Sequence, residues 1–134
     1  MQPHGGGYQQ YRRQREQEIQ TAGRVKLVIM LLEGAICFNR KAMAAMEKKE
    51  RVSALENTDR ANKIVMHLYE SLNFEQGGRV SEQLASLYNY ICDCYSKFAK
   101  KDNSSVSVLD SVNTVLNTLL EGWRKIEEEE KNAG

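Results

Sequence analysis

The clearest structural pattern in the chain lies in residues 80–98, which read VSEQLASLYNYICDCYSKF. An α-helix advances about 100° per residue. At that advance, the larger apolar side chains of this stretch fall within one arc of roughly 100°; they are Val80, Leu84, Leu87, Tyr88, Ile91, Tyr95 and Phe98. A helix with one apolar stripe must bury it against another element. Residues 80–98 therefore predict an amphipathic helix that packs in a helical core.

Three further segments show the helical period, so that helices are expected over about 22–49, 52–74, 79–101 and 104–130. Pro3 is the only proline, and Gly77-Gly78 and two polar stretches separate the segments. Thr21 is a plausible N-cap of the first helix and Asn103 or Ser104 of the last. The pattern predicts an all-α, antiparallel four-helix bundle over residues 21–130, with a flexible N-terminal segment (1–20) and a disordered tail (131–134).

Composition excludes several classes of protein. The 134 residues suffice for one domain, and 41% hydrophobic with 28% charged residues is ordinary for a globular chain. No apolar run approaches the ~18 residues of a membrane span, and the absence of a secretory signal predicts a cytoplasmic protein. The net charge is +1, and the sequence has no basic stripe of the kind that binds the phosphate backbone of nucleic acids. Three cysteines do not suggest a disulfide framework.

The residues that catalysis or metal binding would need are scarce. Helical di-iron sites use Glu-x-x-His pairs, whereas this chain has one reversed pair, His67 and Glu70. Cys92 and Cys94 project about 200° apart on a helix, so they cannot act as a Cys-x-x-Cys redox pair. Gly77-Gly78 lacks the strand and the lysine of a phosphate-binding loop. We expect no enzyme activity, no metal and no cofactor, which leaves binding as the function.

Three surfaces carry more apolar or uncharged character than one core stripe needs. Residues 27–38 are apolar almost all the way around the helix, which fits either a central helix or a helix covered by the N-terminal segment or by a partner. Leu55, Met66 and Tyr69 form a second stripe on the second helix, suited to a core edge or to a binding surface. The fourth helix carries Asp110 as its only charge up to Leu120, which suits either a desolvated interface or an unremarkable surface.

One run of sequence resembles a known family. Residues 21–36, TAGRVKLVIMLLEGAI, resemble the opening helix of the flagellin-specific export chaperone family, FliS. Other pieces match in the same order: Tyr8 and Tyr11, residues 71–78 (SLNFEQGG), Leu84 with residues 88–90 (YNY), and Gly122-Trp123. The resemblance covers roughly residues 8–126.

The resemblance implies a cytosolic type III secretion chaperone for the bacterial flagellum. Such a chaperone binds the C-terminal region of flagellin, prevents its premature polymerisation and keeps it competent for export. It also implies that the tyrosine-bearing N-terminal segment covers part of the groove when no client is bound. An export-gate component or a flagellin regulator would be a further partner. The alternative hypothesis is a regulatory or scaffolding bundle that acts through homodimerisation.

Surplus apolar surface, rather than a motif, selects the residues expected to contact the client or the N-terminal lid. They are Tyr8, Tyr11, Leu27, Met30, Leu55, Met66, Tyr69, Leu109, Asn113 and Leu120.

Overall fold

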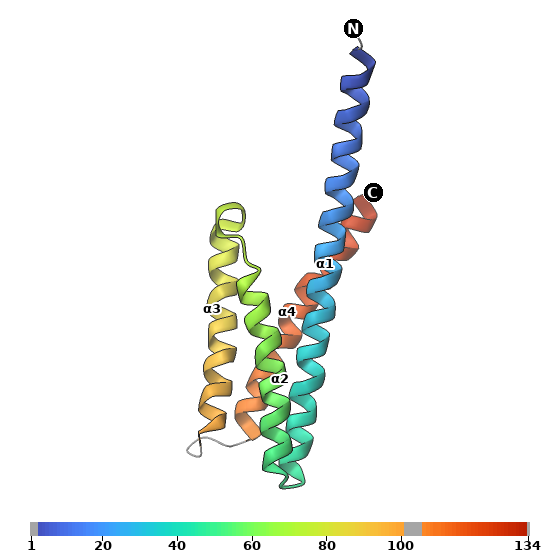
Figure 1. Ribbon diagram of the computed structural model, residues 1–134. Helices are drawn as coiled ribbons and strands as arrows, with labels where there is room; N and C mark the ends of the chain where they lie inside the picture. The colour runs from blue at the N-terminus through green and yellow to red at the C-terminus, as the bar shows by residue number, and fades with distance from the viewer. Residues whose placement is uncertain (1–2, 101–105, 134) are drawn as a thin grey trace.

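The computed structural model describes residues 3–100 and 106–133, and over these residues it is an all-α bundle of four helices. These are α1 (Pro3–Glu47), α2 (Arg51–Glu70), α3 (Phe74–Ala99) and α4 (Val106–Ala133). Successive helices run in opposite directions (Figure 1). The predicted fold class is confirmed. α1 and α3 each pack between α2 and α4, so α1 is not a central helix surrounded by the others.

The first helix begins much earlier than the sequence suggested. α1 is continuous from Pro3, whereas a start near Ala22 was expected. Proline is tolerated in the first turn of a helix, and the Gln, Arg and Glu residues that follow are good helix formers. Thr21 is therefore not an N-cap, since its hydroxyl donates to the Gln17 carbonyl oxygen at 2.9 Å within the helix. The flexibility predicted for residues 1–20 stays a prediction.

The connections between the helices are short. α1 ends at a turn in which Lys49 adopts a left-handed backbone conformation with φ of 61°. The predicted break at Gly77-Gly78 is confirmed as a kink inside α3, where Gly78 has φ of 51°, a region that favours glycine. The Ser81 hydroxyl donates to the Asn73 carbonyl oxygen at 3.0 Å and holds this turn. Asn103 and Ser104, the expected caps of α4, lie outside the described residues.

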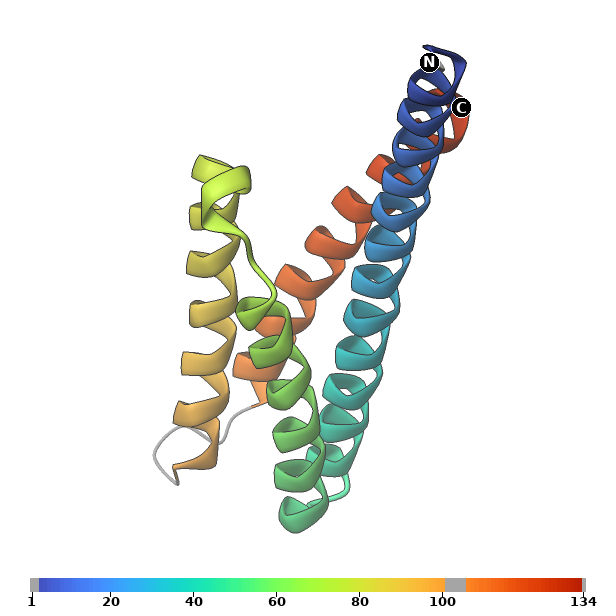
Figure 2. The same ribbon diagram turned by 45° about the horizontal axis from the view of Figure 1, so that its top comes forward.

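The core lies between all four helices. Most of the apolar residues that the helical period placed in the core are buried there. The largest fully buried side chains are Tyr88, Phe98, Leu32, Leu68, Ile91, Leu109, Leu116, Val65, Val112 and Asn39. Val80 and Leu87 were expected in the core but are exposed, and Ile126 of α4 is exposed as well. The reason is that α4 leans away from α3 and toward α1 as it approaches its C-terminus (Figure 2). Val80, at that end of α3, is therefore exposed to solvent.

A buried polar network connects three helices inside this core. Asn39 of α1 is fully buried; its side-chain amide donates to the Leu109 carbonyl oxygen of α4 at 2.9 Å. Its carbonyl oxygen accepts a hydrogen bond of 2.8 Å from the Tyr95 hydroxyl of α3. Because an unpaired buried polar group is costly, these bonds hold the three helices in one register.

We predict that Asn39→Ala lowers the free energy of unfolding by about 2–4 kcal/mol, because it leaves the Tyr95 hydroxyl unpaired and opens a cavity. Urea unfolding followed by circular dichroism measures this loss. Asn89→Ala is the matched control on an exposed position of α3 and should change stability by less than about 0.5 kcal/mol. Equal stability of the two variants would contradict a structural role for the network.

Because two tyrosines are buried, we predict that the free energy of unfolding falls at alkaline pH. Burial raises the pKa of Tyr88 to about 12 and raises the pKa of Tyr95 further still. In the unfolded chain both hydroxyls ionise near pH ~10. Their contribution to stability is therefore complete below that pH and declines above it, by about 1.4 kcal/mol per pH unit for each tyrosine. Urea unfolding of the wild type and of Tyr95→Phe between pH ~9 and ~11.5 should show a shallower decline for the variant.

Candidate binding cleft

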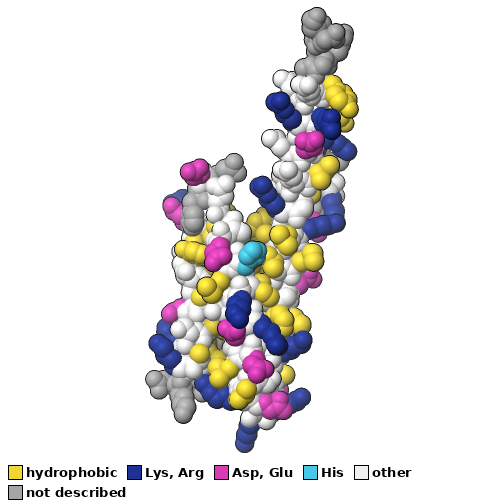
Figure 3. Space-filling model, viewed as in Figure 1, with side chains coloured by type: hydrophobic (Ala, Val, Ile, Leu, Met, Phe, Trp, Pro, Cys, Tyr) yellow, Lys and Arg dark blue, Asp and Glu magenta, His cyan; other side chains and the backbone are white. Residues whose placement is uncertain are grey.

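The bundle is splayed at the end where α2 meets α3. α2 stops at Glu70, α1 continues past it, and α4 leans toward α1 (Figures 1 and 2). The contact between α3 and α4 is the least extensive of those between neighbouring helices. α1 and α3 therefore stand apart at this end with apolar side chains between them. Figure 3 shows hydrophobic side chains gathered where α1 passes the C-terminal end of α2.

A cleft of about 620 Å³ lies between the splayed helices. All four helices contribute to its apolar lining, which comprises Leu27, Val28, Leu31, Leu68, Leu72, Val80, Leu84, Tyr88 and Trp123. Several of these side chains remain accessible, since Val80 is 62% exposed and Leu27 is 51% exposed. A pocket of this volume with an apolar lining is typical of a ligand or peptide site.

The polar residues of the cleft also lie at the splayed end. Arg24 contributes a cationic side chain, and His67, Ser71 and Asn73 add polar groups from the end of α2 and the turn that follows. A cleft with an apolar lining and a few polar groups can accept the apolar anchors of an amphipathic helix.

The residues predicted to contact a client do not form one site. Leu27 alone among them lines the cleft. Met30 is exposed on α1, and Met66 and Tyr69 are exposed on α2, where Leu55 is half-buried. Tyr8 and Tyr11 are exposed on the part of α1 that extends beyond the bundle (Figure 1).

None of the three residues predicted on α4 lines the cleft. Leu109 is fully buried in the core, and Leu120 is 6% exposed and lines a shallower groove between α1 and α4. Contact of Leu109 or Leu120 with a client stays a prediction. Asn113 is half-buried, and its backbone carbonyl oxygen accepts a hydrogen bond of 2.8 Å from the Asn117 side chain. Its contact with a client stays a prediction.

Sequence reasoning missed most of the cleft. Val80, Leu84 and Tyr88 carry the same periodic signal as the buried residues of α3, and Trp123 continues the stripe of α4. Nothing in the period distinguishes a residue that faces a neighbouring helix from one that faces a gap. The Gly77-Gly78 pair marked the kink near the start of α3 but could not show that α4 leans away.

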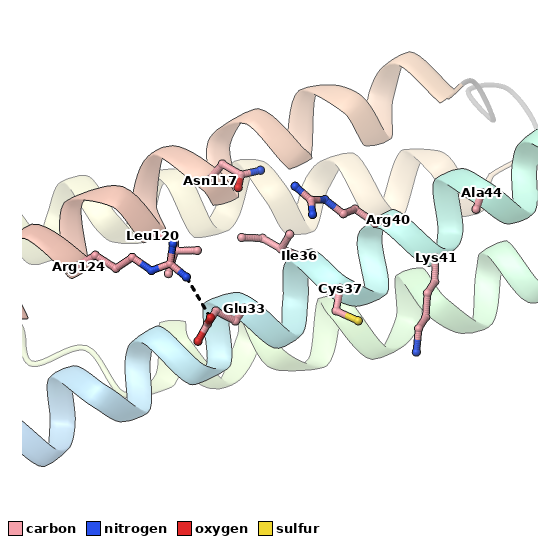
Figure 4. Close-up of a pocket in the computed structure, with 9 residues that line it drawn as sticks. All are labelled: Glu33, Ile36, Cys37, Arg40, Lys41, Ala44, Asn117, Leu120 and Arg124. Carbon is pink, nitrogen blue, oxygen red and sulfur yellow. Dashed lines mark hydrogen bonds and ion pairs between the residues drawn. The ribbon is translucent and has the colours of Figure 1, made fainter.

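A second, shallower groove of about 560 Å³ lies between α1 and α4 (Figure 4). Glu33 of α1 and Arg124 of α4 form an ion pair of 3.0 Å across it. Both side chains are about half exposed, so the pair contributes at most about 1 kcal/mol. Arg40 and Lys41 make the groove cationic, and Cys37 lies among them.

No other feature of the described residues suggests a cofactor. Within residues 3–100 and 106–133, no three His, Cys, Asp or Glu side chains are grouped so that they could hold a metal ion. All three cysteines are free thiols, and burial raises the pKa of Cys92. Over the same residues, no helix has the length and apolar character to cross a membrane.

Comparison with known proteins supplies the family. The family described as "Flagellar protein FliS" matches residues 7–130. The flagellar secretion chaperone FliS of Campylobacter jejuni is 31% identical over 108 residues, covering 78% of this chain and 80% of the relative. The FliS of Vibrio cholerae is 26% identical over 117 residues, covering 87% and 85%. The chain therefore belongs to the FliS family of flagellar secretion chaperones, which are not enzymes.

Proposed function

We propose that this chain is a cytoplasmic chaperone that binds the C-terminal region of flagellin, prevents premature polymerisation and keeps flagellin competent for export. Membership of the FliS family supports the role in flagellar secretion. The sequence resemblance to flagellin-specific export chaperones implies that flagellin is the client. The observation that carries the proposal is the apolar cleft at the splayed end of the bundle, because its lining remains accessible although it is contributed by all four helices.

The physical argument for this client is that the cleft suits an amphipathic segment that is disordered before it binds. Such a segment gains free energy when its apolar side chains leave water against Leu27, Val80 and Trp123. It must also lose conformational entropy as it becomes ordered. The two terms partly cancel, so binding remains weak enough for release at the export machinery.

The other predicted residues that remain accessible lie on α1, α2 and α4. A client segment that leaves the cleft along α1 would pass Tyr11 and Tyr8, which lie beyond it on the same helix (Figure 1). Met30 lies one turn from Leu27 on α1. Leu55, Met66 and Tyr69 provide a separate patch on α2, and Asn113 lies on α4.

The alternative of a scaffolding bundle with no part in flagellar secretion is not retained, because the family is one of flagellar secretion chaperones. An export-gate component or a flagellin regulator stays a predicted further partner.

The test is calorimetric titration of the full chain with the C-terminal region of its own organism's flagellin, with peptide helicity followed by circular dichroism. We expect saturable binding with a negative change in heat capacity and a gain of helix. Leu27→Glu should weaken binding more than about tenfold, because it places a charge in the apolar cleft. Absence of heat and of induced helix would overturn the proposal.

Val52→Glu is the matched control for Leu27→Glu. Val52 is an exposed apolar residue in the first turn of α2 and does not line the cleft, so this variant should bind as the wild type does. Tyr11→Ala and Met66→Glu test the outer surface, and each should reduce affinity while total helicity is unchanged. If both retain wild-type affinity, contact is confined to the cleft.

A further inference from the structure

The apolar cleft at the splayed end contains one arginine, Arg24 of α1. Among the described residues that line the cleft, it is the only one that is a lysine, arginine, aspartate or glutamate. Arg24 precedes Leu27, Val28 and Leu31 by three, four and seven residues, and all four line the cleft. These spacings place the four side chains on one face of a helix. The apolar face that α1 presents to the cleft therefore ends at a cation.

Within residues 3–100 and 106–133, the guanidinium group of Arg24 takes part in no ion pair and no hydrogen bond. Other exposed arginines are paired: Arg12 lies 3.6 Å from a carboxylate oxygen of Glu16, and Arg124 lies 3.0 Å from one of Glu33. The side chain of Arg24 is exposed, so water solvates its charge in the client-free chain. Its five N–H donors are available to a ligand.

The position of Arg24 along α1 places it at one end of the cleft. α2 ends at Glu70, whereas α1 continues past that point toward its N-terminus (Figure 1). Arg24 lies one helical turn closer to that N-terminus than Leu27 and Val28. A client segment whose apolar side chains contact Leu27 and Val28 therefore reaches Arg24 at one of its ends.

The cost of covering an unpaired cation favours a client with a carboxylate at this end. A segment that fills the cleft displaces water from around Arg24. A cation that loses water without gaining a counter-ion destabilises a complex. A carboxylate offsets this cost, because a guanidinium group donates two parallel hydrogen bonds to it. An apolar segment without an anion at this end is therefore disfavoured.

We propose that Arg24 is a specificity determinant of the cleft and pairs with a carboxylate at one end of the client's apolar segment. This inference rests on the proposed function, since the carboxylate belongs to the client of the same site. The carboxylate is either the side chain of an aspartate or glutamate or the C-terminus of the client chain. In both cases the pair fixes the direction of the client in the cleft, because Arg24 lies at one end of the lining.

The test is calorimetric titration of the full chain with a peptide that covers the C-terminal region of its own organism's flagellin. Arg24→Gln should raise the dissociation constant about tenfold, because the client's carboxylate loses its counter-ion. Arg24→Lys should give an intermediate dissociation constant, since lysine keeps the charge but not the two parallel donors. The circular dichroism spectrum and the urea midpoint should not change, because Arg24 is exposed.

Lys26→Gln is the matched control for Arg24→Gln. Lys26 is exposed on α1, two residues from Arg24, and does not line the cleft. The control removes the same charge from the same helix and should bind the peptide as the wild type does. Equal dissociation constants for Arg24→Gln and Lys26→Gln would overturn this inference and leave the proposed function standing. A wild type that does not bind the peptide would overturn both.

Modified peptides identify which carboxylate pairs with Arg24. One peptide has a C-terminal amide, and in a second peptide every aspartate and glutamate is replaced by asparagine or glutamine. The peptide that lacks the paired carboxylate should bind the wild type about tenfold more weakly and should no longer distinguish the wild type from Arg24→Gln. If both modified peptides keep the full difference between these two proteins, Arg24 pairs with no carboxylate and the inference is wrong.

Discussion

The buried side chain of Asn39 is the interaction on which the arrangement of the helices depends. It lies in the core with its amide on the Leu109 carbonyl oxygen and its own oxygen accepting from Tyr95. Apolar packing alone is non-directional and tolerates small shifts of one helix along another. A buried amide has fixed partners, so a shift of any one helix would leave a polar group unpaired. The register of α1, α3 and α4 follows from this constraint.

A second polar contact closes the same end of the bundle. Arg51, at the start of α2, donates to the carbonyl oxygens of Phe98 and Ala99 at the end of α3. Its guanidinium also lies over the Phe98 ring, 5.6 Å from the centroid. The closed end and the splayed end are therefore different in kind. The first is held by directed polar contacts, and the second presents apolar side chains from helices that have separated.

This asymmetry explains how a small bundle can be stable and still keep apolar surface available. The closed end supplies the packing that orders the helices, so the splayed end need not collapse to bury Leu27, Val80 and Trp123. The N-terminal part of α1 also extends past the C-terminal end of α2 (Figure 1).

The sequence by itself determined the helical period, the number of helices, the break at Gly77-Gly78 and the absence of an obvious catalytic set. These are local properties, since each depends on residues within a few turns of one another. The early start of α1 could have been read from residues 8–20, which are good helix formers, but the glycines before them and the lack of an apolar stripe obscured it.

Only the tertiary structure decided which members of each stripe are buried. Leu109 and Leu120 lie in the core, whereas Leu87 and Val80 are exposed, Val80 at the end of α3 from which α4 leans away. The angle between two helices depends on contacts between residues far apart in the chain, such as the bond from Asn39 to Leu109. Periodicity records which face of a helix is apolar, whereas the position of the neighbouring helix determines how much of that face is covered.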